Sequence, residues 1–239
     1  MGATNVHFWS CLYASLSMKR YFCLTLSPVS AIIRIIVNER GVVLELREIA
    51  SITAGYPFRG KIPEMPSSRV IAVQMKDVST EAGIRWSGCT PTELTIKRES
   101  DLLCAGDILV AARGSRHYAV GIDEGLNSVG KQAVAAPHFF VVRLNLPEIL
   151  PEFVVWLLNQ PPCQRYFEQN AEGTLTKSIR RSVLETAPIV APTLAEQNTI
   201  VAMANTLRQE QRLVQQLVQN GERMMGSIAS ELFSRKEIK

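Results

Sequence analysis

The stretch Thr193-Leu-Ala-Glu196-Gln-Asn-Thr-Ile200 decides the fold of the C-terminal part of this chain. Thr193 and Glu196 have the T-x-x-E spacing of a capping box, in which each side chain satisfies a free backbone N–H of the first helical turn. The residues that follow favour helix. We therefore predict a helix from Leu194 to Phe233, about 60 Å long at roughly 1.5 Å per residue.

An apolar stripe runs along this predicted helix. Ile200, Leu207, Val214 and Ile228 recur at seven-residue intervals, and only Gly221 interrupts the series. Such a pattern is typical of a coiled-coil seam. A helix this long extends beyond any single domain, so the seam needs another helix; the alternative is an ordinary C-terminal helix folded back on its own core. The residues predicted to mediate dimerisation are Ile200, Leu207, Val214 and Val218.

Length and composition fit one globular domain with this helix attached. The chain has 239 residues, is 46% hydrophobic and carries a net charge of +4, which permits a nucleic-acid partner without requiring one. The odd number of cysteines and the lack of a C-x-x-C pair favour neither a disulfide framework nor a zinc site. We expect a reducing, cytoplasmic location. The cysteines are Cys11, Cys23, Cys89, Cys104 and Cys163.

The N-terminal region differs from the rest of the chain. Phe8 to Leu26 is apolar and aromatic, but Lys19 and Arg20 interrupt it, so no segment there is long enough to cross a bilayer. We predict that residues 1–40 are a poorly packed extension without a function of their own, and we expect no membrane association.

Between the N-terminal extension and the C-terminal helix, residues 41–192 are predicted to form a mixed α/β domain. The spacer and dimerisation helix follows over residues 193–239. Runs rich in β-branched residues predict strands. A helix is expected to start at Pro151 and to end at Pro161-Pro162. The predicted strands are Arg69–Val73, Asp107–Ala112 and Phe139–Leu144, and the stretch Gln74–Val78 is expected to be a polar loop.

No catalytic motif is complete in the sequence. Gln160-Pro-Pro-Cys163 lacks the leading Asp or Asn and the trailing aromatic of an amino-methyltransferase motif. The segment from Gly125 has the spacing of a phosphate-binding loop as far as Lys131, but Gln132 replaces the hydroxyl residue that holds magnesium. His7, His117 and His138 have no metal-ligand spacing. We predict a non-catalytic chain without a metal or cofactor.

Three segments combine basic and aromatic or hydroxyl residues in the way that DNA-reading loops do. Guanidinium groups pair with guanine, while lysines and backbone amides hold phosphates. Each segment alone also fits a solvated loop, and Tyr56 or Phe58 alone also fits packing. The predicted DNA-binding residues are Tyr56, Phe58, Arg59 and Lys61; Arg113, Ser115, Arg116, His117 and Tyr118; and Lys177, Arg180 and Arg181.

Several pieces of the chain, in this order, resemble the target-recognition half of a type I restriction-modification specificity subunit. The resemblance covers roughly Leu44 to Leu232. A full subunit of that family carries two recognition domains and two spacer helices, so this chain resembles a half-subunit. The pieces are Leu46-Arg-Glu-Ile-Ala-Ser-Ile-Thr-Ala-Gly55-Tyr-Pro-Phe-Arg59, Leu103–Ser115, Phe153–Asn159, Gly173-Thr174 with Ile179–Leu184, and Pro188–Ile200.

The resemblance implies a protein that reads double-stranded DNA while partner subunits perform the chemistry. It implies type I methyltransferase partners, with or without a restriction and translocase subunit. Two recognition domains are regained by homodimerisation or by pairing with a second specificity half, so the expected site is bipartite. One alternative is a stand-alone or remnant DNA-binding and dimerisation protein without catalytic partners; another is an enzyme whose active site has no local signature.

Overall fold

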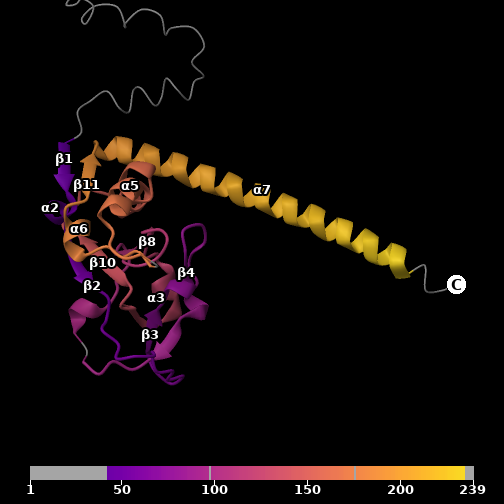
Figure 1. The fold of residues 1–239 in the computed structure, drawn as a ribbon, viewed down its shortest axis with the longest axis horizontal. Coiled ribbons are helices and arrows are strands. Elements are labelled where there is room, and N and C mark those ends of the chain that lie inside the picture. The colour runs from indigo at the N-terminus through magenta and orange to yellow at the C-terminus, as the bar shows by residue number, and fades with distance from the viewer. Residues whose placement is uncertain (1–41, 97, 175, 235–239) are drawn as a thin grey trace, which may run out of the picture. The chain divides into compact units, whose positions relative to one another are not determined.

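The computed structural model describes residues 42–234 except 97 and 175 (Figure 1). The predicted extension over residues 1–40 lies outside the described residues. The described residues belong to one compact unit of mixed α and β structure that ends in a long helix. This agrees with the predicted fold class.

A four-stranded antiparallel sheet forms the centre of the domain. Its order is β2, β10, β7, β8, and Phe140 of β10 lies opposite Ala54 of β2 and Val110 of β7. Both faces of this sheet are covered, which explains why β10 reads as a continuous apolar run. The strands are β2 (Ala50–Ala54), β7 (Ile108–Ala111), β8 (Ala119–Gly121) and β10 (Phe139–Leu144).

Helices pack on one face of the central sheet. Phe140 and Val142 of β10 face a core that includes the fully buried Phe153 and Phe167. The helices that supply this core include α4 (Pro151–Leu158), α5 (Pro161–Asn170) and α6 (Arg181–Glu185).

A second sheet packs on the opposite face. Phe139 and Val141, the alternate residues of β10, join Leu109 in a core with Ile71 and Ala133 of that sheet. Its central strand β3 pairs antiparallel with β6 and parallel with β9. The elements on this side are β3 (Val70–Val73), β6 (Thr90–Thr92), β9 (Gln132–Ala135) and α3 (Gly125–Val129).

Shorter elements complete the domain. β1 (Val42–Glu45) pairs with β11 (Pro188–Ala191), and β4 (Val78–Ser79) forms a hairpin with β5 (Gly83–Ile84). The remaining elements are α2 (Leu46–Ile49) and the 3-10 helices η1 (Met75–Asp77), η2 (Trp86–Gly88) and η3 (Glu99–Asp101).

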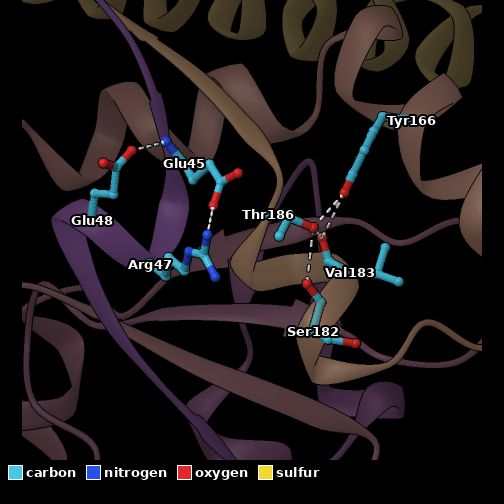
Figure 2. Close-up of polar contacts among 7 residues, drawn as sticks. All are labelled: Glu45, Arg47, Glu48, Tyr166, Ser182, Val183 and Thr186. Atoms are coloured by element: carbon cyan, nitrogen blue, oxygen red, sulfur yellow. Dashed lines mark hydrogen bonds and ion pairs between the residues drawn. The ribbon is translucent and has the colours of Figure 1, made fainter.

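Two local contact groups near the β1–β11 pair are drawn in Figure 2. The Glu48 carboxylate accepts a hydrogen bond from the Glu45 N–H at 2.6 Å and so closes the first turn of α2. The hydroxyl of Tyr166 donates to the Val183 carbonyl at 3.2 Å and lies 2.8 Å from the Thr186 hydroxyl. The second group fastens α6 to α5.

The long helix α7 (Leu194–Ser234) begins where the capping box predicts. The Thr193 N–H donates to Glu196 Oε2 at 2.9 Å, and the Glu196 N–H donates to the Thr193 hydroxyl at 3.4 Å. The first turns of α7 pack on α4, and Figure 1 shows the helix as one continuous element. From residue 209 to 234 every residue except the half-buried Gly221 is exposed. The alternative of a helix covered by its own core is therefore wrong.

Several local predictions need correction. The strand expected to start at Asp107 starts one residue later, because the buried Asp107 carboxylate accepts a hydrogen bond from the Cys104 N–H at 2.8 Å. The polar loop expected over Gln74–Val78 contains η1 and the start of β4. The prolines at 161 and 162 end α4 as predicted, but they also occupy the first turn of α5, where the missing N–H costs no helical hydrogen bond.

Candidate nucleic-acid interface

Backbone hydrogen bonds bring two of the three predicted DNA-binding segments together. The Gly114 N–H, in the turn after β7, donates to the carbonyl of Lys177 at 3.0 Å. The Ile179 N–H donates to the carbonyl of Ala112 at 2.9 Å. The turn between β7 and β8 and the loop between α5 and α6 therefore form one surface, although they lie far apart in the sequence.

The loop between α5 and α6 is itself held in a tight turn. Glu172 and Ser178 exchange two backbone hydrogen bonds of 2.8 Å each. Gly173 has φ +105°, and a Cβ there would lie 2.6 Å from the carbonyl oxygen of Thr176. Only glycine fits this position without moving the backbone. A surface cavity of 470 Å³ opens between this loop and Arg113.

Three basic side chains on this surface are exposed and available. Arg113, Arg116 and Lys177 form no ion pair with any other residue that the structure describes. The other two arginines predicted in these two segments form ion pairs: Arg180 contacts Glu172 at 2.8 Å and Arg181 contacts Glu185 at 2.7 Å. We name the exposed group Arg113, Ser115, Arg116 and Lys177 the basic ridge.

The structure corrects the prediction of a direct DNA contact for His117. Its side chain is buried, its Nδ1 lies 3.0 Å from the carbonyl oxygen of Ala111, and its ring packs edge-on against Phe167. Burial lowers the pKa of His117 below its ordinary value. His117 therefore holds the β7–β8 turn against α5. Tyr118, half-buried, packs edge-on against Phe139.

The predicted DNA-binding segment with Tyr56 to Lys61 follows β2, and it leaves the central sheet at the same end as the β7–β8 turn of the basic ridge. β10 lies between β2 and β7, so the loops that follow β2 and β7 leave the sheet at the same end. The Gly55 N–H donates to the Phe139 carbonyl and the Ala112 N–H donates to the His138 carbonyl, each at 2.8 Å. Both loops are thus tied to the start of β10.

Gly55 is required by a close backbone approach. A Cβ at this position would lie 2.1 Å from the carbonyl oxygen of Ala136, which no side chain can accommodate. The Tyr56 ring that follows is mostly buried, and its hydroxyl accepts a hydrogen bond from the Ile96 N–H at 3.0 Å. The Tyr56 ring also packs edge-on against Phe58, with centroids 4.7 Å apart. Tyr56 is therefore a support for this loop more than an exposed contact.

A second cavity, of 400 Å³, lies between this loop and the segment Glu93–Asp101. Arg59 and Arg98 both line it, and neither forms an ion pair with a described residue. Lys61 is exposed on the same loop. Arg98 is not among the DNA-binding residues predicted from the sequence. The basic pair Lys97-Arg98, in an otherwise polar stretch, is the sequence signal that indicates it.

The described part of the chain holds no cluster of three or more His, Cys, Asp or Glu that could bind a metal ion. Burial raises the pKa of the Cys89 thiol to about 12 and also raises the pKa of Cys163, so neither thiol is activated as a nucleophile. Among the described residues, no helix is both long and apolar enough to cross a membrane.

No known family model and no curated protein matches the sequence. Several solved structures are similar, and three of them are the following. An S subunit of a type I restriction-modification system from M. genitalium is 19% identical, with 72% of this chain and 40% of that chain covered and a TM-score of 0.47. The HsdS subunit from Thermoanaerobacter tengcongensis is 14% identical, with 73% and 39% covered and a TM-score of 0.50. A chain from a study of complex assembly and conformational transition in the type I R-M system is 15% identical, with 80% and 41% covered and a TM-score of 0.48.

The likeness to the Thermoanaerobacter subunit shows the fold. The mixed α/β domain followed by the long helix α7 is an HsdS-like arrangement, as the sequence resemblance predicts. The chain spans about two fifths of the length of the structures it matches. What the whole subunits bind and assemble with therefore enters below as a proposal for this chain.

Proposed function

We propose that this chain carries a DNA-recognition domain and a spacer helix of a type I restriction-modification specificity subunit. The observation that carries the proposal is the basic ridge, which two hydrogen-bonded loops build on a domain of HsdS-like fold. Two basic segments that lie far apart in the sequence form one surface in this fold, and Arg113, Arg116 and Lys177 on it form no ion pair with another described residue.

The basic ridge suits DNA. In our proposal Arg113 and Arg116 read guanine through paired guanidinium hydrogen bonds, and Lys177 holds a phosphate. The loop with Arg59 and Lys61 extends the contact from the same end of the sheet. His117 and Tyr56 support these loops from inside the domain.

The apolar seam of α7 suits a second helix. Leu207, Val214 and Val218 are between 55% and 58% exposed, whereas Ile200 packs partly against the domain core. Gln197 and Arg208, which face the domain, lie on a different side of the helix. In our proposal two copies, or this chain and a second specificity half, pair through this seam and hold two recognition domains on one bipartite site.

The chemistry belongs to other subunits in this proposal. Type I methyltransferase subunits, with or without a restriction and translocase subunit, would use the surface of α7 and the domain, and this chain would need no cofactor. Isolated exposed Leu and Val residues are common on protein surfaces, but an apolar stripe that runs along most of a long helix is typical of an interface.

The test is selection from a random duplex pool, with the chain alone and with a type I methyltransferase subunit. A split, inverted-repeat motif supports the proposal. The double variant Arg113→Ala with Arg116→Ala should lose that motif, whereas Arg165→Ala, which removes an exposed arginine of α5, should keep it. Enrichment of an unsplit motif would favour the stand-alone DNA-binding alternative. No enrichment in either sample would refute DNA recognition.

A further inference from the structure

The spacer helix α7 is attached to the recognition domain at two separate places. At the first, the buried Gln197 side chain bonds to the segment before α4. At the second, the Arg212 guanidinium donates a hydrogen bond to the carbonyl of Glu81, at the tip of the β4–β5 hairpin. Gln197 and Arg212 are fifteen residues apart, which corresponds to about 22 Å along a helix.

Ile200 and Val201, just after the first attachment, pack against the domain core, but beyond them the helix and the domain are separated by cavities. A cavity of 280 Å³ lies there, lined by Asn205 and Arg208 of α7 and by residues of β8, α4 and the hairpin. A smaller cavity of 200 Å³ follows it, between Gln211 and Gln215 of α7 and the hairpin tip. The packed first turns of α7 are thus followed by two cavities, and the hydrogen bond from Arg212 to the hairpin lies beside them.

Hydrogen bonds and core packing hold the β4–β5 hairpin in position. The Ser79 hydroxyl accepts hydrogen bonds from the N–H groups of Glu81 at 3.2 Å and Ala82 at 3.3 Å, which fixes the tip. Val78 pairs with Ile84, and Ile84 is buried in the core below the hairpin. A side-chain oxygen that bonds the backbone two and three residues ahead is a standard way to order a turn. The partner of Arg212 is thus a fixed carbonyl.

We propose that Arg212 is a positioning residue that sets the angle between the recognition domain and α7, and through that angle the gap between the two halves of the DNA site. This inference rests on the proposed function. A helix held only at its start can pivot about that point, whereas a second contact about 22 Å further along fixes its direction. In a pair of such helices, the direction of each one sets the distance between the two recognition domains.

Arg223 provides a matched control. It lies on the exposed part of the same helix, and its described contact is a hydrogen bond of 3.0 Å to Asn220, one turn earlier on α7. Arg223→Ala therefore removes an arginine from α7 without touching the hairpin. Ser79→Ala is a second test variant, because it loosens the hairpin tip and leaves α7 unchanged.

The experiment uses the full chain and a duplex library in which the selected half-sites are fixed and only the gap length varies. We expect Arg212→Ala to lower the preference for the best gap over gaps one base pair longer or shorter by about two- to fivefold. Base preference within each half-site should stay as in the wild type. Ser79→Ala should change the gap preference in the same direction, Arg212→Lys should restore part of it, and Arg223→Ala should leave it unchanged.

Two results would overturn the inference, and they distinguish failure of the positioning role from failure of the proposed function. If Arg212→Ala and Ser79→Ala both keep the wild-type gap preference, the positioning role is wrong and the proposed function stands. If the wild-type chain selects no split site, the proposed function is wrong, and the positioning role falls with it.

Discussion

The side-chain carbonyl of Gln197 accepts a hydrogen bond from the backbone N–H of Leu150 at 2.9 Å, and this bond joins the spacer helix to the start of α4. The amide nitrogen of the same side chain donates to the carbonyls of Glu148 and Pro192, both at 2.9 Å. Gln197 is 1% exposed, so these bonds are shielded from water. One polar side chain therefore satisfies three backbone groups at the junction.

Gln197→Ala should lower the free energy of unfolding by about 3 kcal/mol, because it leaves buried backbone groups without partners. Urea unfolding of the full chain, followed by circular dichroism, measures this loss. The control is Gln209→Ala, which changes an exposed glutamine on the same helix and should alter stability by less than about 0.5 kcal/mol. Equal effects of the two substitutions would contradict the role given to Gln197.

Gly55→Ala should destabilise the fold by about 2 to 3 kcal/mol, since the new Cβ would meet the backbone carbonyl of Ala136 at 2.1 Å. The melting temperature of the variant, compared with that of the wild type, measures this loss of stability. Gly221→Ala is the contrasting variant, because a Cβ there meets no described atom within 4 Å and alanine is the better helix former. A Gly55→Ala protein as stable as the wild type would show that the loop and the β9–β10 turn do not approach as closely as described.

How much of the fold the sequence predicts depends on how local each signal is. The start of α7 follows from Thr193 and Glu196, three residues apart, because a capping box acts within one helical turn. β10 follows from its continuous apolar run, which is typical of a strand buried on both faces. These signals lie within the element that they define.

The candidate site was less predictable, because its arrangement rests on contacts between distant segments. The bond from the Gly114 N–H to the Lys177 carbonyl involves backbone groups that almost every residue has, so no side-chain pattern reports it. His117 stands in the same basic stretch as Arg113 and Arg116, and only the packing of α5 on the β7–β8 turn decides that its ring points inward. The composition of a loop identifies its residues but not their direction.

The basic ridge predicts two kinds of DNA-binding defect. Arg113→Ala should weaken binding to the selected site by about 1 to 3 kcal/mol and relax one base position, because a guanine contact is lost. Lys177→Ala should weaken binding to all sequences alike and lower the salt dependence of log Kd by about one unit of slope, because one phosphate contact is lost. Fluorescence anisotropy with matched and mismatched duplexes at several salt concentrations separates the two. If Arg113→Ala weakens binding to every sequence equally, Arg113 does not read a base.

The buried ring of His117 predicts a loss of stability in mild acid. Burial is the main cause that lowers its pKa in the folded chain, the charge of Lys177 acts in the same direction, and the hydrogen bond to the Ala111 carbonyl opposes both. The unfolded chain therefore binds more protons than the folded chain once the pH drops below about 6.5. The His117 contribution to stability is fully present above that pH and is lost as the pH falls toward the folded pKa.

Urea unfolding at several pH values between about 7.5 and 5 measures this contribution as a slope. In His117→Gln the free energy of unfolding should fall less steeply with decreasing pH than in the wild type, whatever its absolute value, because the titrating group is gone. His138→Gln, at an exposed position in the neighbouring turn, is the control that removes a histidine without changing a buried ring. If His117→Gln and the wild type lose stability in parallel, His117 is not held neutral by its surroundings, and the inward placement of its ring is wrong.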